Sequence, residues 1–205
     1  GESVGYIALE ESIKRTALGL MAIEVKKPLH LDRKVIDDDT FKNSFSSTVG
    51  SGLLYLYDSF GSTESENLLS KIRYLAKGLG VRWVILDHLS IVVSGLETYD
   101  ERKLIDVTMT KLRSLVEETG IGLILVSHLR RPEGNKGYED GIQTSLNSLR
   151  GSTAIAGLAD CVIGLERDQN DEENKKYTTV RVLKNRHTGD TGKCGTLFFN
   201  EDTAC

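Results

Sequence analysis

Two acidic residues stand at the ends of apolar runs that have the composition of buried β-strands. Asp87 ends the run Val81–Asp87, and Glu10 directly follows the run Val4–Leu9. Parallel strands place their carboxyl ends at one edge of the sheet, so we expect both carboxylates there. One carboxylate can orient and deprotonate an attacking water, and a second can hold the magnesium shell of a bound nucleotide. The pair therefore predicts phosphate-bond hydrolysis.

A third apolar run, Ile121–Ser127, leads directly into His128. If the three strands are neighbours in one parallel sheet, Glu10, Asp87 and His128 line one rim, where the histidine can sense a terminal phosphate. Each residue taken alone has a simpler interpretation: Asp87 can cap a turn, Glu10 can be a helix N-terminal acid, and His128 can be a surface histidine. Glu11 is the better candidate for the helix acid, and the coincidence of three strand ends favours the site.

Lys184 and Arg186 share one face of a predicted strand, because alternate residues of a strand point the same way. The strand runs into the glycine-rich turn Thr188–Gly192. Two cations held together at a strand end suit a polyphosphate supplied from outside the domain, which is the arginine-finger arrangement. The alternative is an ordinary basic hairpin.

A basic loop follows His128 at once and contains Arg130, Arg131 and Lys136. Such a loop can grip a phosphate backbone, and its position after a phosphate sensor would couple that grip to the state of the nucleotide. A solvated loop is the alternative. Further along, the segment Leu149–Ser152 opens a predicted helix whose backbone donors can bind an anion.

The order of the predicted elements indicates an α/β fold. Strand-like runs alternate with segments of helical periodicity, which implies a mainly parallel sheet with helices on both faces. The continuously apolar Val81–Asp87 predicts a strand that is covered on both faces. The last strands follow one another across short turns, so we expect an antiparallel C-terminal edge. The predicted strands are Val4–Leu9, Leu53–Tyr57, Val81–Asp87, Ile121–Ser127, Asp160–Glu166, Thr178–Leu183 and Gly195–Phe199. The predicted helices are Glu11–Lys26, Ser65–Leu79, Asp100–Thr119 and part of Ser145–Leu158, with a short helix and a loop in Leu29–Ser47 and a loop in Arg130–Gly141.

Composition excludes several classes of protein. The 205 residues carry a net charge of −4, which excludes a globally basic surface for nucleic acid but not a local basic loop. Cys161, Cys194 and Cys205 lack metal-ligand spacing and are odd in number, which fits a reducing cytoplasm better than a disulfide framework. No apolar run reaches ~18 residues, so we expect no membrane partner. We expect one domain, residues 1–205.

One motif is missing from the sequence. A phosphate-binding loop requires the pattern G-x-x-x-x-G-K-[ST] between a strand and a helix, and no such string occurs. Because a strand begins almost at Gly1, we expect this loop and the strand before it to lie upstream in a longer native chain. The sheet should then be incomplete, with the edge of the strand Ile121–Ser127 exposed, covered or swapped.

Taken together and in order, these segments resemble the hexameric replicative DNA helicases of the DnaB-like family, and in particular the helicase half of phage primase–helicases of the T-odd type. The resemblance implies a RecA-like P-loop NTPase core whose first strand, the Walker A strand, is absent from this sequence. The segments that carry the resemblance are Leu9–Ser12, Val84–His88, Asp100–Lys103, Ser127–Leu129, Leu149–Ser152, Leu165–Arg167, Leu183–Arg186 and Thr188–Gly192.

The resemblance implies a role for each candidate residue. Glu10 is the expected catalytic base, Asp87 is the Walker B residue near Mg²⁺, and His128 is the γ-phosphate sensor. Arg186 is the expected arginine finger, which reaches into the neighbouring subunit's site, with Lys184 beside it.

Five further residues fall at positions that the family uses for binding. Phe199 lies where the family places an aromatic side chain against the nucleotide base, with core packing of the last strand as an equal alternative. Arg167 is expected near the nucleotide and the subunit interface. Arg130, Lys136 and Arg150 fall in or beside segments that face the central channel, through which single-stranded DNA passes.

The function expected for the complete protein is that of an NTP-dependent replicative DNA helicase. It would translocate 5′-to-3′ on single-stranded DNA as a ring, a hexamer in this family, using Mg²⁺ with ATP or dTTP. A primase domain or primase protein is an expected partner, and a bacterial or phage-infected cell is the expected setting. The 205-residue chain alone is expected to be inactive, because it lacks the phosphate-binding loop and its lysine.

Two alternatives stay open. The first is a RecA- or clock-type ATPase of recombination or signalling, against which the segment Leu183–Gly192 and the segment Leu149–Ser152 argue. The second is a non-catalytic module for DNA binding or oligomerisation.

Overall fold

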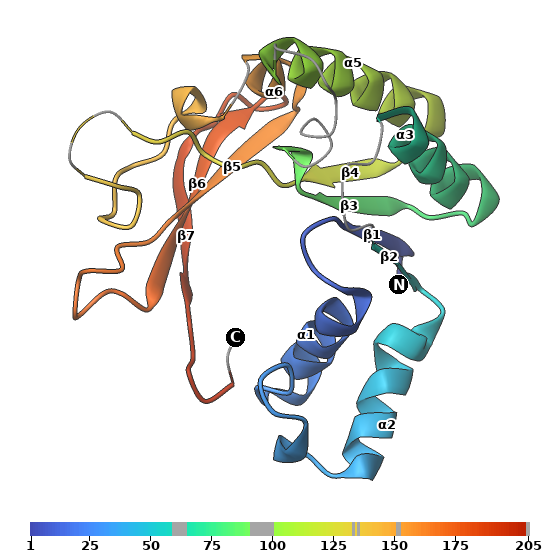
Figure 1. Ribbon diagram of the computed structural model, residues 1–205. Helices are drawn as coiled ribbons and strands as arrows, with labels where there is room; N and C mark the ends of the chain where they lie inside the picture. Colours follow the sequence, from blue (N-terminus) through green and yellow to red (C-terminus); the bar gives the residue numbers. More distant parts are fainter. Residues whose placement is uncertain (59–64, 91–100, 133, 135, 151–152, 204–205) are drawn as a thin grey trace. The chain divides into compact units, whose positions relative to one another are not determined.

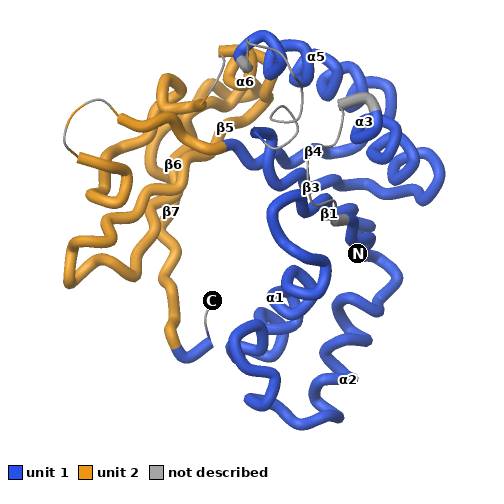
Figure 2. The backbone as a smooth tube through the Cα atoms, viewed as in Figure 1, with its two compact units in different colours: residues 1–127, 202–205 blue, residues 128–201 orange. Residues whose placement is uncertain are grey.

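The computed structural model describes residues 1–58, 65–90, 101–132, 134, 136–150 and 153–203 (Figure 1). The chain divides into two compact units, which Figure 2 shows in separate colours. Unit 1 comprises residues 1–127 and 202–205, and unit 2 comprises residues 128–201. Each unit contains its own sheet, so each is described by itself.

Unit 1 contains a parallel four-stranded sheet in the order β2-β1-β3-β4. Helices α3 and α5 lie on one side of it, and α1 and α2 lie on the other (Figure 1). The strands are β1 (Val4–Ala8), β2 (Leu54–Asp58), β3 (Trp83–Asp87) and β4 (Gly122–Leu125). The helices are α1 (Ile13–Val25), α2 (Asp38–Ser47), α3 (Ser65–Arg73) and α5 (Glu101–Thr119). Shorter turns are η1 (Arg33–Val35), η2 (Val49–Ser51) and η3 (Tyr74–Gly78).

The face of the sheet that packs on η3 and the helices beside it is the main core of unit 1. Ile7 and Leu86 are paired in register and are completely buried there. A Cβ atom on Gly5, which shares this face, would lie 2.9 Å from the side chain of Leu75. The backbone of β1 therefore approaches η3 as closely as a glycine allows. Buried side chains of α3 and α5 complete this core: Leu68, Leu69, Ile72, Ile105, Met109, Leu112 and Leu115.

The opposite face of the sheet is only partly covered by described residues. Trp83 on β3 is 45% exposed and Ile124 on β4 is 49% exposed. The prediction that the strand 81–87 is covered on both faces is therefore met on one face only. The physical reason is that α1 and α2 pack around a core of their own, which contains Met21 and Leu29, instead of spreading over β3 and β4.

Unit 2 is built on an antiparallel three-stranded sheet in the order β5-β6-β7. The turn η4 and the short helix α6 precede it in the chain. The elements are η4 (Leu146–Ser148), α6 (Thr153–Leu158), β5 (Cys161–Glu166), β6 (Tyr177–Asn185) and β7 (Gly192–Phe198). Glu166, at the end of β5, pairs with Thr179, and Cys161, at its start, pairs with Asn185.

The predicted alternation of strands and helices is confirmed, and the boundaries differ by a few residues. The segment 29–47 contains η1 and α2, and the predicted helix Ser65–Leu79 finishes as the wider turn η3. The first residue of the predicted helix Asp100–Thr119 lies outside the described residues. No described strand pairs with the outer edge of β4, as expected for the strand 121–127. Among the helices that the structure describes, none is long and apolar enough to cross a membrane.

Candidate functional site

The ends of β1 and β3 bring the two predicted carboxylates to one edge of the unit 1 sheet. Ala8 is in register with Asp87, and the backbone N–H of Leu9 donates to the carbonyl of Asp87 at 2.8 Å. Glu10 follows directly, so it leaves β1 beside the end of β3. The carboxyl edge of a parallel sheet thus carries both acids, as the sequence predicted.

A tyrosine that no sequence motif indicated holds the Asp87 carboxylate. The Tyr6 hydroxyl donates to Asp87 Oδ2 at 3.1 Å. Burial and, after it, the adjacent Asp87 carboxylate together raise the pKa of Tyr6 to about 12. The phenol therefore stays protonated and remains a donor at any physiological pH. Tyr6 pairs with Ile85, so Tyr6 and Asp87 are diagonal neighbours on one face; this register could have revealed the contact.

Glu10 is contacted by a histidine that follows Asp87. His88 Nε2 lies 3.4 Å from Glu10 Oε2, and the His88 side chain is 6% exposed whereas that of Glu10 is 62% exposed. The Asp87–His88 peptide bond is cis. A buried imidazole thus touches a carboxylate that remains open to solvent. Such a carboxylate is positioned on one side and can still meet a water molecule on the other.

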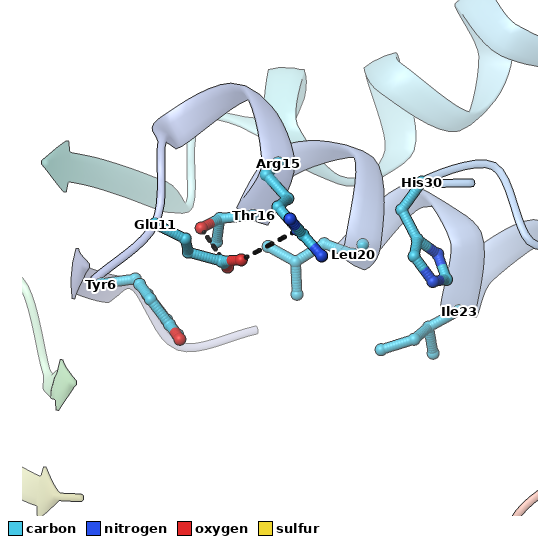
Figure 3. Close-up of a pocket in the computed structure, with 8 residues that line it drawn as sticks. Tyr6, Glu11, Arg15, Thr16, Leu20, Ile23 and His30 are labelled. Carbon is cyan, nitrogen blue, oxygen red and sulfur yellow. Dashed lines mark hydrogen bonds and ion pairs between the residues drawn. The ribbon is translucent and has the colours of Figure 1, made fainter. Parts of the chain in front are cut away.

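The neighbouring acid Glu11 lies just before helix α1, and its side chain contacts that helix. Ser12 is the N-cap of α1, and the Glu11 carboxylate accepts a hydrogen bond from Thr16 Oγ1 at 2.7 Å. Figure 3 shows the bond between Glu11 and Thr16 together with the ion pair between Glu11 and Arg15, which measures 3.7 Å. The first turn of α1 itself contains no acid, and Glu11 contacts the helix from the residue before its N-cap. Glu10 is left at the sheet edge.

Asp87 also fits a metal ion of the kind that the fold family uses. A carboxylate has about four acceptor positions, and Tyr6 occupies one of those on Asp87. Carboxylate oxygens are ligands that Mg²⁺ prefers, commonly through water. The remaining acceptor positions of Asp87 are thus compatible with a metal ion bound through water.

His128 is the first residue of unit 2 and is exposed. Residues 128–130 are hydrogen-bonded to residues 148–150, so the two ends of the intervening loop lie side by side. The N–H of Arg150 donates to the His128 carbonyl at 3.0 Å, and the N–H of Arg130 donates to the Ser148 carbonyl at 2.9 Å. Leu129 and Leu149 form the bridge between these bonds. The structure therefore brings the predicted DNA-contacting residues Arg130 and Arg150 together at the neck of one loop.

The far part of this loop is tied to the sheet of unit 2 by a buried acid. Glu166 accepts hydrogen bonds from the N–H and the hydroxyl of Thr144, both at 2.8 Å, and from Arg181 at 2.7 and 3.0 Å. Its side chain is 8% exposed. Burial raises the pKa of Glu166, but the bonds from Arg181 and Thr144 oppose this effect and hold the pKa below its usual value. Glu166 lies within the family-like segment Leu165–Arg167, but the sequence alone indicated no role for it.

Lys136 is exposed and lies in the same loop. The anion site expected at 149–152 falls partly on Gly151 and Ser152, which lie outside the described residues.

Lys184 and Arg186 both reach the C-terminal end of α6. The Lys184 ammonium donates to the carbonyls of Ala156, Gly157 and Ala159. Arg186 donates to the Gly157 carbonyl at 2.7 Å. The two cations are therefore neighbours, as predicted, and both contact backbone oxygens of their own unit.

Arg167 and Phe199 lie together at the other end of the same sheet. The Arg167 guanidinium is 5.9 Å from the centre of the Phe199 ring. Phe199 follows β7 and is 38% exposed, which argues against core packing of its ring. Arg167 follows the end of β5, whereas Arg186 lies next to its start. The length of β5 separates them by about 20 Å.

The fold and the carboxylate edge define a class of protein. One similar solved structure, an ATPase domain, has a TM-score of 0.79 with 20% sequence identity, covering 100% of this chain and 73% of that chain. A DnaB-like replicative helicase, solved in a study of its interactions with primase, has a TM-score of 0.74 with 20% identity, covering 99% of this chain and 49% of that chain. These likenesses establish the fold as the RecA-like core of helicase ATPase domains.

The family described as DnaB-like helicase C terminal domain matches residues 3–204. The chain therefore belongs to the DnaB-like helicase C-terminal domain family. It is 40% identical over 207 residues to the DNA helicase/primase of Enterobacteria phage T3, covering 99% of this chain and 36% of that protein. It is 28% identical over 186 residues to the replicative DNA helicase DnaB of Leifsonia xyli subsp. xyli, covering 89% of this chain and 40% of that protein. The chain thus spans about two fifths or less of the length of these curated relatives.

Proposed function

We propose that this chain supplies the hydrolytic and DNA-contacting residues of a ring-shaped replicative DNA helicase, which moves on single-stranded DNA at the expense of an NTP. The observation that carries the proposal is the adjacency of Glu10 and Asp87 at the carboxyl ends of β1 and β3. Membership of the DnaB-like family, and the names of the two relatives, support the assignment to replication.

Glu10 is the proposed general base. Its carboxylate is exposed, and the contact with His88 fixes one of its oxygens, so the other can orient a water and accept its proton. Asp87 is held by Tyr6 and would hold Mg²⁺ beside the phosphates of ATP or dTTP. When bound, the ion neutralises charge that develops on the phosphate oxygens.

The cations of unit 2 are proposed to serve two different nucleotides. Arg186 and the pair Arg167–Phe199 occupy opposite ends of the sheet of unit 2. This separation supports a site that is shared between subunits, with Arg186 as the finger for the neighbour's nucleotide. Phe199 is proposed to stack on a base, which the partial exposure of its ring and the guanidinium beside it support. His128 is the proposed phosphate sensor.

Arg130, Arg150 and Lys136 are the proposed contacts to single-stranded DNA. The first two meet at the loop neck that also carries the His128 carbonyl. A change at His128 would therefore be transmitted to the loop through the hydrogen bond from the Arg150 N–H to the His128 carbonyl. A primase domain or primase protein is the proposed partner of the complete helicase, as the name of the phage relative suggests.

The test is hydrolysis by a full-length subunit that carries this chain together with its phosphate-binding loop. Replacing Glu10→Gln should lower DNA-stimulated hydrolysis by about 10²–10⁴-fold while NTP binding persists, because only the base is lost. Glu2→Gln is a matched control, since Glu2 forms an exposed ion pair with Arg82 at 3.6 Å. Hydrolysis by Glu10→Gln at the normal rate would overturn the proposal. Binding of DNA without any hydrolysis by the unsubstituted subunit would favour a non-catalytic module.

A further inference from the structure

The C-terminal end of α6 is the place where Lys184 is fixed. Its ammonium donates to Ala156 O at 2.6 Å, Gly157 O at 3.1 Å and Ala159 O at 2.8 Å. A lysine ammonium has three N–H donors, so these bonds use all of them. The last carbonyls of a helix have no partner within the helix, and Lys184 satisfies them. Lys184 is thus an anchor that fastens β6 to α6.

Arg186 is bound to the same place in a different way. Its backbone N–H donates to the carbonyl of Asp160 at 2.8 Å, which fixes the main chain. Its side chain contacts Gly157 O at 2.7 Å and the Asp160 carboxylate at 3.2 Å. The Arg186 and Asp160 side chains are 43% and 39% exposed. The backbone is therefore held while the guanidinium stays at the surface.

The partner of the guanidinium has the chemistry of a phosphate oxygen. A carboxylate and a phosphate both present anionic oxygens to the planar fork of an arginine. Asp160 immediately precedes β5, and the next residue, Cys161, pairs with Asn185. Exchange of one anion for the other therefore requires the Arg186 side chain to rotate away from Asp160 and from the Gly157 carbonyl, while its backbone N–H can stay bonded to the Asp160 carbonyl.

We propose that the Asp160 carboxylate binds the Arg186 guanidinium within one subunit. The guanidinium then leaves Asp160 and binds a phosphate of the nucleotide on the neighbouring subunit. Asp160 is then a positioning residue that restrains hydrolysis until the guanidinium exchanges the carboxylate for a phosphate. The inference rests on the proposed role of Arg186 as an arginine finger. An exposed ion pair changes such an equilibrium by no more than about fivefold, so the restraint is weak enough to be reversed by a nucleotide.

The experiment uses the full-length subunit and compares Asp160→Asn with the unsubstituted protein. Without DNA, Asp160→Asn should raise kcat for NTP hydrolysis about two- to fivefold, with KM nearly unchanged. The reason is that the Arg186 guanidinium is free of residue 160 in a larger fraction of the subunits. Adding Arg186→Ala to either background should abolish this activity. Glu118→Gln is the control: it opens another exposed ion pair, with Arg73 at 3.0 Å, and should leave kcat unchanged.

The variants distinguish a failure of the Asp160 restraint from a failure of the proposed finger role of Arg186. If Asp160→Asn leaves kcat unchanged or lowers it while Arg186→Ala is inactive, the restraint does not exist, but the finger assignment stands. If Arg186→Ala hydrolyses NTP at the normal rate, the finger assignment fails, and the inference fails with it. A merely structural Asp160 would lower kcat together with the Tm of the subunit, which is the opposite of the expected rise.

Discussion

At the residue scale, each carboxylate of the sheet edge depends on one neighbour to which no motif assigns a role. Tyr6 donates to Asp87, and His88 lies beside Glu10. Neighbours of this kind fix the direction in which a carboxylate presents its free oxygens. The strength of metal binding at Asp87 should therefore depend on a phenol that does not touch the metal.

Tyr6→Phe removes that donor and leaves the ring in place. In the full-length subunit, the Mg²⁺ concentration needed for half-maximal hydrolysis should rise about 10-fold, the usual effect of losing an outer-shell hydrogen bond. Magnesium titrations of the hydrolysis rate measure it. Tyr55→Phe on β2 is a matched control, because it removes a phenol from a strand that carries neither acid. An unchanged magnesium requirement in Tyr6→Phe would show that Asp87 is positioned by other contacts.

At the scale of elements, the Glu166 cluster connects the loop of Arg130 and Arg150 with β5 and β6. Thr144 packs so closely on β5 that a Cβ atom on Gly164 would lie 2.1 Å from its hydroxyl oxygen. The glycine is thus required where the loop crosses the strand. The loop is therefore anchored at its neck and at Thr144.

Glu166→Gln should destabilise unit 2 by about 1–2 kcal/mol at pH 7, because Arg181 loses its charged hydrogen-bond partner while the pair stays partly open to solvent. Since the folded pKa of Glu166 is lowered, its contribution is present above the unfolded pKa and is lost as the pH falls below that value. The cost of the substitution should therefore shrink in acid. Hydrogen exchange of the β5 and β6 amides at several pH values measures it. Glu172→Gln, at an exposed pair with Lys175, should cost close to nothing.

The elements were more predictable than their contacts. Apolar runs such as Val81–Asp87 located the strands, and the rule for parallel sheets correctly placed Glu10 next to Asp87. The contacts of Lys184 were not predictable, because they depend on where the short helix α6 ends in space. The spacing of Lys184 and Arg186 correctly indicated that they share a face of the strand. It could not show that the Lys184 ammonium would donate to backbone carbonyl oxygens.

At the scale of the whole molecule, both units expose large apolar side chains. Ile163 and Leu165 of β5 are 60% and 61% exposed, and Trp83 and Ile124 of unit 1 are 45% and 49% exposed. Large exposed apolar side chains can mark a surface that another segment or chain covers. It supports the proposal that subunits of the complete helicase associate.

The 205-residue chain by itself is expected to show no NTP hydrolysis, because its sequence contains no phosphate-binding loop. Release of inorganic phosphate, measured with and without Mg²⁺, tests this expectation. A metal-dependent activity of the chain that disappears in Glu10→Gln would contradict it and would require another phosphate-binding segment within these residues.

Binding of single-stranded DNA by the full-length ring should weaken steeply with salt, although the chain is acidic overall. Each neutralised phosphate of a single strand contributes about −0.7 to the slope of log K against log salt concentration. If Arg130, Arg150 and Lys136 each contact one phosphate, replacing any one by Ala should reduce the slope by about 0.7 per engaged subunit. Lys42→Ala removes an exposed cation from α2 in unit 1 and should leave the slope unchanged. Fluorescence anisotropy with a labelled oligonucleotide at several salt concentrations gives these slopes. Equal slopes for the loop variants and the unsubstituted protein would show that the strand is held elsewhere, and the loop after His128 would then have no part in translocation.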